Sequence, residues 1–205
     1  MKKGCSGLLV LVLGALVVLA LWAIPKYNGL VKSEESVKTA WGNVETQYQA
    51  RADLIPNLVN TVKGYAKHEQ ETLESVINAR ANATNPNNQN QNKDLTPEDQ
   101  QKYLAAQGEV TNALSRLIAV AEAYPDLKAN QNFLELQNQL ESTERRIAVA
   151  RKDYNEVAKE YNIKRRSFPT NIIASIFGFG ERPVFQAQEG ADKAPEVDFG
   201  TSETK

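Results

Sequence analysis

The amino-acid sequence predicts an all-α protein, with an N-terminal transmembrane helix followed by an antiparallel four-helix bundle of long helices. Three observations support this prediction. An uncharged apolar run lies near the N-terminus. Beyond it, apolar residues recur at alternating spacings of three and four, the period of helices that bury one face. Proline residues and a cluster of asparagine and glutamine separate these periodic stretches, as expected where helices end.

The chain divides by composition into four predicted segments. Residues 1–26 form a membrane anchor and residues 27–167 form the bundle, in which residues 82–95 are an Asn/Gln-rich loop. A short apolar segment follows at 168–185, and an acidic, disordered tail follows at 186–205. A chain of 205 residues suits one domain with such appendages.

Charge and cysteine content exclude several classes of protein. The 24 basic and 25 acidic residues nearly cancel, and a chain without excess positive charge is a poor candidate for nucleic-acid binding. The single cysteine, Cys5, cannot form an internal disulfide. It also precedes the apolar run, so it does not fit a lipoprotein signal. Stability must therefore come from helix packing.

The anchor is the run from Leu8 to Ile24, which contains no charged residue. As a helix it extends roughly 25 Å, at the short end of what crosses a bilayer core of about 30 Å. A cleaved signal peptide is the alternative. Such peptides have apolar cores of about 7 to 15 residues and small residues at the cleavage site, whereas Leu21 and Trp22 precede Ala23 here. We therefore expect an uncleaved, single-pass anchor.

The orientation of the anchor stays open. Lys2 and Lys3 precede the apolar run, and Lys26, Lys32 and Lys38 follow it. Because basic residues flank both ends in similar number, the positive-inside rule does not select the side of the soluble domain.

Two apolar seams predict the first half of the bundle. The first contains Leu30, Val37, Trp41, Val44 and Tyr48, and the second contains Ile55, Leu58, Val62, Tyr65, Leu73 and Val76. Between them, Pro56 would remove a hydrogen bond from an unbroken helix, and Asp53 can cap a new one. We predict a helix break at Asp53, with one kinked helix as the alternative.

Two further seams predict the second half. The third contains Tyr103, Gln107, Val110, Leu114, Leu117, Ala121 and Tyr124, and the fourth contains Phe133, Leu136, Leu140, Thr143, Ile147, Ala150, Tyr154, Val157 and Tyr161. Thr96 can cap the third helix, with Pro97 at its first position, and Pro125 can end it. The fourth seam, with charged residues between its positions, predicts a long helix with coiled-coil-like packing.

The apolar segment after the last helix has two alternative positions. Lys164-Arg165-Arg166 ends the helix, and Phe168, Ile172, Ile173, Ile176, Phe177 and Phe179 follow. In a bundle that runs out, back, out and back, this end lies beside the bilayer. The segment is too short to span a membrane but can lie in its interface, with the basic triplet on lipid headgroups. Packing on the end of the bundle is the alternative.

Several strings of residues are more specific than helical periodicity requires. They are Tyr27-Asn28-Gly29-Leu30-Val31, Arg51-Ala52-Asp53-Leu54-Ile55-Pro56-Asn57-Leu58-Val59, Val62-Lys63-Gly64-Tyr65-Ala66, His68-Glu69, Tyr124-Pro125-Asp126-Leu127-Lys128-Ala129, Gln139-Leu140-Glu141, Thr143-Glu144, Arg146-Ile147, Ala150-Arg151, Tyr154-Asn155 and Phe168-Pro169. In these strings, which cover most of the chain, the sequence resembles the LemA family of bacterial single-span proteins. The resemblance implies the anchor and the bundle, and it implies no established enzymatic activity. The Asn/Gln-rich loop and the acidic tail fall outside the family pattern.

No catalytic, cofactor-binding or metal site is predicted from the residues. His68-Glu69 begins a zinc-protease helix motif, but Thr72 stands where the second histidine is needed. His68 is the only histidine. No serine lies in a strand-to-helix elbow, so no nucleophilic serine is predicted for which His68 could act as the base. We therefore expect neither an enzyme nor a cofactor.

Ten polar residues are candidates for a ligand pocket between the helices: Arg51, Asp53, Asn57, Glu69, Arg80, Glu141, Glu144, Arg146, Arg151 and Asn155. If several of them converged, they could hold a small polar or anionic ligand. Taken singly, such residues are typical of helix caps, solvated faces and interhelix pairs.

The expected function is a membrane-anchored helical scaffold or adaptor of the bacterial envelope, in the cell membrane. An unrecognised enzyme or a small-ligand-binding bundle is the alternative. The expected partners are the lipid bilayer and membrane or envelope proteins. Positions between the seam residues of the last helix are mostly charged or polar, so a large obligate oligomer interface is not expected.

Overall fold

A computed structural model describes residues 3–85 and 96–186, with side chains described from residue 11 onward in the first of these ranges. Its elements are α1 (Lys3–Tyr65), α2 (Gln70–Ala83), α3 (Pro97–Glu122), α4 (Pro125–Lys128), α5 (Gln131–Arg166) and α6 (Thr170–Ile176). The described residues contain no strand. The predicted all-α fold class is confirmed.

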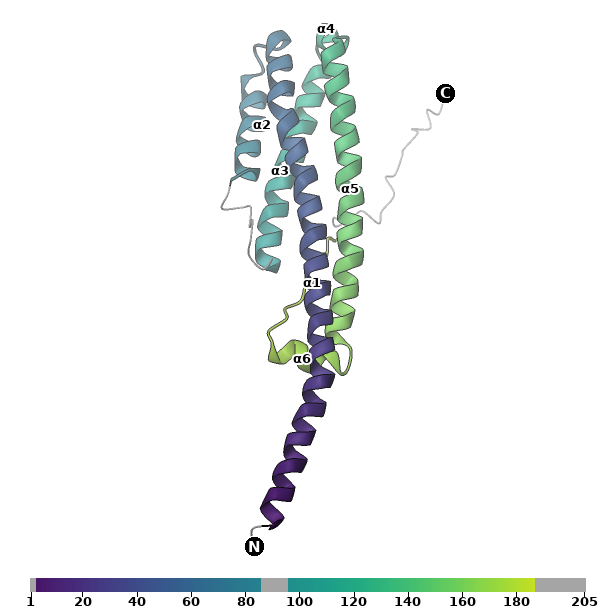
Figure 1. The fold of residues 1–205 in the computed structure, drawn as a ribbon. Helices are drawn as coiled ribbons and strands as arrows, with labels where there is room; N and C mark the ends of the chain where they lie inside the picture. Colours follow the sequence, from purple (N-terminus) through teal and green to yellow (C-terminus); the bar gives the residue numbers. More distant parts are fainter. Residues whose placement is uncertain (1–2, 86–95, 187–205) are drawn as a thin grey trace, which may run out of the picture.

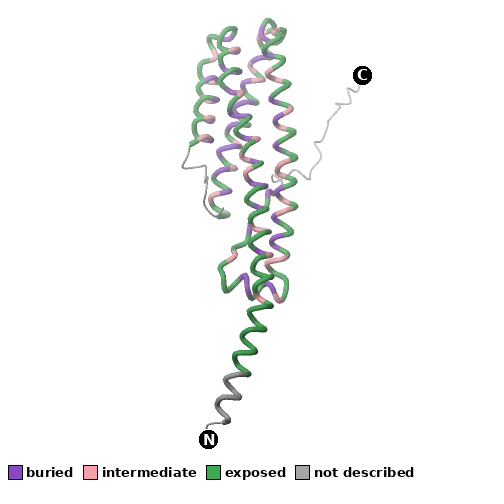
Figure 2. Tube along the Cα trace, in the orientation of Figure 1, coloured by how far each residue is buried: buried purple, intermediate pink, exposed green. Residues whose placement is uncertain are grey.

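Helix α1 contains both the predicted anchor and the first part of the helical domain. Figure 1 shows α1 leaving the other helices and continuing alone to the N-terminus. Among the described residues it is the one helix that is long and apolar enough to cross a membrane. Its apolar side chains from Leu11 to Ile24 are almost all exposed (Figure 2). Such exposure suits a helix that is surrounded by lipid.

The predicted helix break at Asp53 is wrong. Helix α1 passes through Asp53 and Pro56 without interruption. Pro56 has no amide hydrogen for the carbonyl of Ala52, four residues earlier. That carbonyl instead accepts a 2.8 Å hydrogen bond from Nε of Arg80 in α2. A side chain from a neighbouring helix therefore replaces the missing backbone donor, and no new helix start is needed.

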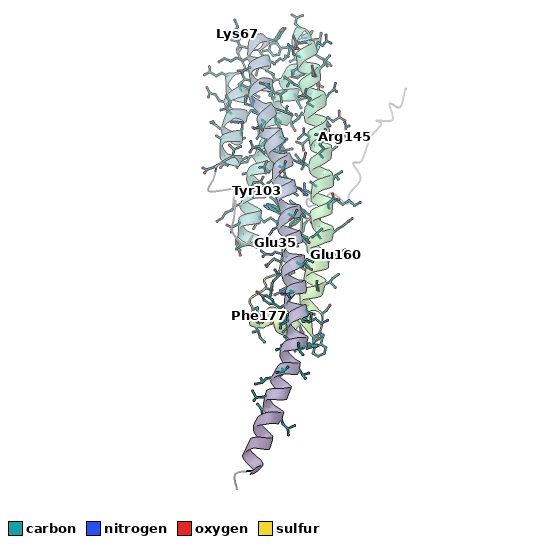
Figure 3. The ribbon with its side chains drawn as sticks, in the orientation of Figure 1. Glu35, Lys67, Tyr103, Arg145, Glu160 and Phe177 are labelled. Atoms are coloured by element: carbon teal, nitrogen blue, oxygen red, sulfur yellow. The ribbon has the colours of Figure 1, made fainter. Side chains whose placement is uncertain are left out.

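The chain first reverses at residues 66–69, between α1 and α2. The second predicted seam therefore spans two helices, and Tyr65, at the end of α1, is exposed and accepts a hydrogen bond from Asn130 (2.8 Å). Figure 3 shows Lys67, in this turn, at the opposite end of the domain from Phe177. The reversal thus lies far from the apolar N-terminal part of α1.

The four long helices lie side by side (Figure 1). Helix α5 packs along α1, and α2 packs mainly against α3. The predicted start of α3 is confirmed, because the hydroxyl of Thr96 accepts a 3.2 Å hydrogen bond from the amide of Asp99. Pro125 begins the short α4 directly after α3, as expected for a residue that cannot continue a helix.

Buried side chains form two clusters along the domain. The cluster far from the anchor contains Ile55, Leu58, Val62, Val76, Val110, Leu114, Leu117, Leu127, Phe133 and Leu140. The cluster nearer the anchor contains Leu30, Val37, Trp41, Val44, Tyr48, Tyr103, Ile147, Tyr154, Tyr161, Ile173 and Phe185. The seam predicted for the last helix is thus confirmed in α5, where its residues are buried or half-buried.

An extended segment, residues 179–185, follows α6 and lies along α5; we call it the strap. Asn155 donates to the carbonyl of Phe185 (3.1 Å) and accepts from its amide (2.8 Å). Asn162 makes the same two bonds with Arg182, at 2.7 and 3.0 Å. Because seven residues make about two helical turns, both amides point to one face of α5. Side-chain amides therefore hold the strap's backbone.

Aromatic and charged contacts complete the strap. Phe185 stacks on Trp41 with ring centroids 5.8 Å apart, and the hydroxyl of Tyr154 donates to the carbonyl of Pro183 at 2.8 Å. Arg182 is buried and pairs with Glu34 of α1 at 2.5 Å. The strap therefore connects α1 and α5 near the end of the domain from which the apolar part of α1 leaves.

Two predicted segments are only partly described. Of the predicted loop 82–95, residues 82 and 83 belong to α2, and residues 86–95 lie outside the described residues. Of the predicted acidic tail, residues 187–205 lie outside the described residues as well.

Candidate functional site

Arg51 is a charged side chain in the core, only 2% exposed. One terminal nitrogen donates to Thr111 and to the carboxylate of Glu144, both at 2.9 Å. The other donates to the carbonyl and the side-chain oxygen of Gln107, at 3.0 and 2.6 Å. The guanidinium also lies 5.1 Å from the ring centroid of Tyr48. The network joins α1, α3 and α5, and protein acceptors occupy both terminal nitrogens. Arg51 and Glu144 therefore have a structural role.

Three of the ten candidate residues lie on solvated faces. Asp53 accepts a 2.7 Å hydrogen bond from Gln49 within α1 and caps no helix. Asn57 is exposed. Glu141 pairs with Arg145 along α5 at 2.5 Å, with both side chains mostly exposed. Exposed pairs of this kind contribute little stability, and these three residues do not share one pocket.

The turn between α1 and α2 contains two more of the residues considered. Glu69 accepts a 3.1 Å hydrogen bond from the hydroxyl of Tyr124, and this bond raises the pKa of Tyr124. His68 is exposed in the same turn. In the part of the chain that the structure describes, no group of three His, Cys, Asp or Glu side chains could hold a metal ion. Arg80 donates a hydrogen bond to the carbonyl of Ala52.

Arg151 and Asn155 hold the strap. The guanidinium of Arg151 lies 4.6 Å from the ring centroid of Phe185, in a cation–π contact. Asn155 pairs with the backbone of the same residue. Sequence reasoning missed this site because its partner, the strap, has no periodic pattern. The signal that could have revealed it is the seven-residue spacing of Asn155 and Asn162 on α5.

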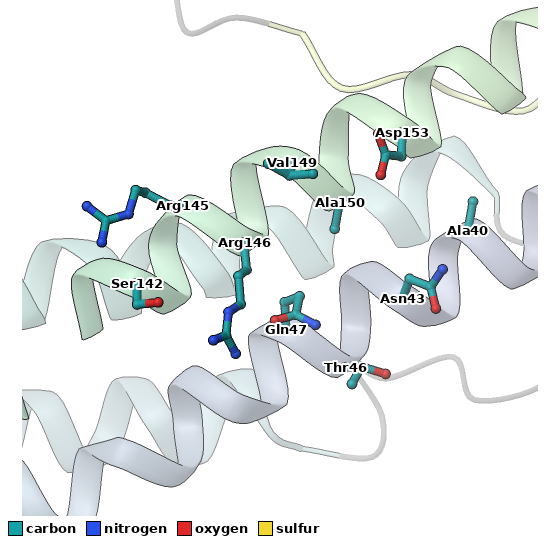
Figure 4. Close-up of a pocket in the computed structure, with 10 residues that line it drawn as sticks. All are labelled: Ala40, Asn43, Thr46, Gln47, Ser142, Arg145, Arg146, Val149, Ala150 and Asp153. Carbon is teal, nitrogen blue, oxygen red and sulfur yellow. The ribbon is translucent and has the colours of Figure 1, made fainter. Parts of the chain in front are cut away.

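Arg146 lies in an open groove between α1 and α5, with a volume of about 460 Å³ (Figure 4). Its lining residues are Ala40, Asn43, Thr46 and Gln47 from α1 and Ser142, Arg145, Arg146, Val149, Ala150 and Asp153 from α5. In Figure 4 the side chain of Arg146 points toward Gln47, whereas that of Arg145 points away from α1. We call this surface the α1–α5 groove.

The α1–α5 groove offers hydrogen-bonding groups to a polar surface. Asn43 and Gln47 supply amides, and Arg146 supplies a guanidinium suited to planar acceptors. Ser142 and Asp153 are separated by roughly 16 Å along α5, so they cannot form a nucleophile and base pair. The groove therefore suits binding better than catalysis.

A second groove, of about 540 Å³, lies on another side of α1 and is lined by residues that include Glu45, Asp53 and Tyr103. Burial raises the pKa of the Glu45 carboxyl and of the Tyr103 hydroxyl above their ordinary values. Both shifts come from desolvation of the charged form. They predict that the stability of the domain depends on pH.

Comparison with known proteins gives consistent results. The model of the LemA family matches residues 40–199. The chain is 28% identical over 182 residues to magnetosome protein MamQ 2 of Paramagnetospirillum magneticum, covering 82% of this chain and 67% of that protein. It is 23% identical over 182 residues to protein LemA of Metamycoplasma hominis, covering 89% of this chain and 77% of that protein. It is 24% identical over 182 residues to magnetosome protein MamQ of Magnetospirillum gryphiswaldense, covering 82% of this chain and 67% of that protein. None of these names states an enzymatic activity.

Proposed function

The chain belongs to the LemA family, and from this premise we propose that it is a single-pass, membrane-anchored helical scaffold or adaptor of the bacterial envelope and not an enzyme. Its role is to hold the α1–α5 groove at a set distance from the bilayer, where another membrane or envelope protein binds.

The continuity of α1 carries this proposal. The helix has 63 residues, which corresponds to about 95 Å at helical rise. No loop separates the apolar N-terminal part from the domain, so the groove cannot swing freely about a linker. The α1 side of the groove, from Ala40 to Gln47, begins roughly 25 Å and ends roughly 35 Å beyond Ile24 along the helix. A partner must therefore reach this height above the membrane.

The lining of the groove indicates the kind of contact. Amides and guanidinium groups line it, and such surfaces bind carboxylates and backbone carbonyls of a partner through hydrogen bonds. A groove of this polarity fits a transient interface better than an obligate one, because obligate interfaces are more apolar.

Site-specific photo-crosslinking in living cells tests the proposal. The full chain carries a photoreactive amino acid at Thr46, which is exposed in the groove, or at Ser75, which lines a separate groove between α2 and α3. We expect a discrete adduct from Thr46 and none of the same mass from Ser75. Removal of residues 1–26 should abolish the adduct, because the partner is reached at the membrane.

A charge reversal supplies the matched control. Arg146→Glu should abolish the adduct at Thr46, whereas Arg116→Glu, at another exposed arginine, on α3, should leave it unchanged. An adduct that both variants retain would contradict the proposed groove. Substrate turnover by the purified protein, lost on replacement of a groove residue, would favour an enzyme instead.

A further inference from the structure

Four large apolar side chains are exposed at the end of the domain from which α1 leaves. Phe168, in the turn after α5, is 81% exposed, and Ile172, Ile176 and Phe177 of the α6 region are 46, 69 and 58% exposed. We call these four side chains the foot. Helix α6 lies beside α1 at the lower end of the domain (Figure 1). A cluster of this kind on a protein surface usually marks a contact with another molecule or a membrane.

The opposite side of α6 already has a partner. Ile173 and Ala174 are buried in the same cluster as Leu30 of α1. Hydrogen bonds to the strap hold the chain after α6, including one from Tyr161 to the carbonyl of Gly180 at 2.9 Å. The segment after α5 thus buries Ile173 and Ala174 against the domain, whereas the side chains of the foot stay exposed.

Contacts with α1 fix the height of the foot. The ring of Tyr27 lies 4.8 Å from that of Phe177 and 5.7 Å from that of Phe179, between centroids. Tyr27 comes three residues, or about 4.5 Å, beyond Ile24, where the apolar run ends. A bilayer with a core of about 30 Å measures about 40–45 Å with its headgroups. Phe177 is therefore held at headgroup depth.

The end of α5 gives the same height independently. The amine of Lys164 donates to the carbonyl of Gly29 at 2.6 Å and to the hydroxyl of Ser33 at 2.9 Å. Helix α5 runs antiparallel to α1 and ends two residues later, at Arg166, roughly 3 Å closer to the membrane. Phe168, in the turn that follows, thus lies at the same end of the domain as Gly29.

The charges of the basic triplet do not all face outward. Lys164 is used within the domain, and Arg165 donates to the carbonyl of Phe179 at 2.6 Å. Arg166 is exposed, as is Lys26 on α1. With two of three charges engaged in internal contacts, apolar side chains must supply most of any membrane contact made here.

We propose that the foot inserts into the headgroup and acyl-chain boundary of the same bilayer that α1 spans. This inference rests on the proposed anchoring by α1. It adds a second attachment, several residues wide, so the domain is held at one tilt and cannot rotate about a single helix. In this arrangement one face of the segment packs on the domain and the other contacts lipid, so the two positions left open by the sequence do not exclude each other.

Fluorescence quenching in nanodiscs tests the proposal with the full chain. In a Cys5→Ser background, a single cysteine replaces Ser175, an exposed residue of α6, or Ser115, an exposed residue of α3. Each carries an environment-sensitive fluorophore, and the discs contain phosphatidylcholine with a nitroxide quencher at a shallow acyl position. We expect several-fold stronger quenching by lipid at Ser175→Cys than at Ser115→Cys, and protection of Ser175→Cys from aqueous iodide.

A matched pair of triple variants supplies the control. Phe168→Asn, Ile172→Asn, Ile176→Asn should make the label at Ser175→Cys as accessible to iodide as that at Ser115→Cys. Tyr65→Asn, Ile77→Asn, Leu134→Asn, which changes three exposed residues outside the foot and outside the α1–α5 groove, should have no effect. Circular dichroism checks that both retain helicity. If the chain does not associate with the discs, anchoring by α1 is refuted. If the label at Ser175→Cys stays protected from iodide in the first triple variant, insertion of the foot into the bilayer is refuted.

Three other outcomes would overturn the inference. Equal quenching of the two labels means that the foot lies in water. Protection from iodide without quenching by lipid means that a second copy of the chain covers the foot. Lipid contact that appears only with anionic lipid and disappears in high salt means that charge, and not the apolar foot, holds the segment.

Discussion

Replacing Arg80 by methionine should destabilise the helical domain much more in the natural sequence than in a Pro56→Ala background. Nε of Arg80 donates to the carbonyl of Ala52 at 2.8 Å, and residue 56 cannot donate to that carbonyl because it is proline. Alanine at position 56 restores the backbone amide. The two changes therefore act on one hydrogen-bond acceptor and should not be additive.

The magnitude follows from the burial of that acceptor. Ala52 is buried, and a buried carbonyl left without a donor costs about 1–3 kcal/mol. Because Arg80 is only half-buried, water can partly replace it, so Arg80→Met should cost about 1–2 kcal/mol. In the Pro56→Ala background the same change should cost about 0.5 kcal/mol or less, which leaves a coupling of about 1 kcal/mol. Pro56→Ala alone should stabilise the domain, by up to about 3 kcal/mol.

Urea unfolding followed by far-UV circular dichroism measures the four free energies of this cycle. Arg116→Met, at an exposed arginine of α3, is the control and should stay within about 0.5 kcal/mol of the natural sequence. Additive effects, within about 0.3 kcal/mol, would refute the idea that Arg80 replaces the missing amide. Destabilisation by Pro56→Ala would show instead that the domain requires the backbone shape that proline imposes.

Three further predictions concern the core, the pH dependence and the anchor. Tyr154→Ala should cost about 3 kcal/mol or more, and Tyr154→Phe about 1 kcal/mol through loss of the bond to the carbonyl of Pro183; an unchanged melting curve would place Tyr154 outside the core. Burial raises the pKa of Glu45 above its ordinary value of 4.5. The folded state therefore binds this proton more readily than the unfolded state, and stability falls as the pH rises from 4.5 through the raised pKa. Glu45→Gln should lack this dependence and be the more stable form at neutral pH in urea titrations; identical profiles would contradict the shift. Removal of residues 1–26 should leave a soluble, strongly helical protein by circular dichroism, and an insoluble or β-rich product would contradict the fold.

The features that were predictable are those set by nearby residues. The seam of α5 could be predicted because buried positions recur along a helix with the helix period, whichever helix packs against them. The start of α3 could be predicted because the residues that define it, Thr96, Pro97 and Asp99, lie within one helical turn. The resemblance to the LemA family was carried by short strings, and the family match confirms it.

The features that were missed depend on residues far apart in the chain. The break predicted at Asp53 followed the usual effect of Pro56, and Arg80, on another helix, removes that effect. The strap has no periodicity, so its contacts with Asn155 and Asn162 were not foreseen. Of the ten candidate polar residues, Arg51 and Glu144 meet across α1 and α5, which helix periodicity alone cannot place.

The sequence by itself determined the all-α class, the apolar N-terminal helix, the start of α3 and the family, because each depends on local propensity or on a short run of residues. Only the tertiary structure decided that α1 is continuous, that Arg51 and Arg80 are used within the domain, and that one face of α6 is buried while the foot is exposed. Those outcomes depend on contacts between residues that lie far apart in the chain, such as the hydrogen bonds to buried polar groups. The local sequence pattern does not predict such contacts.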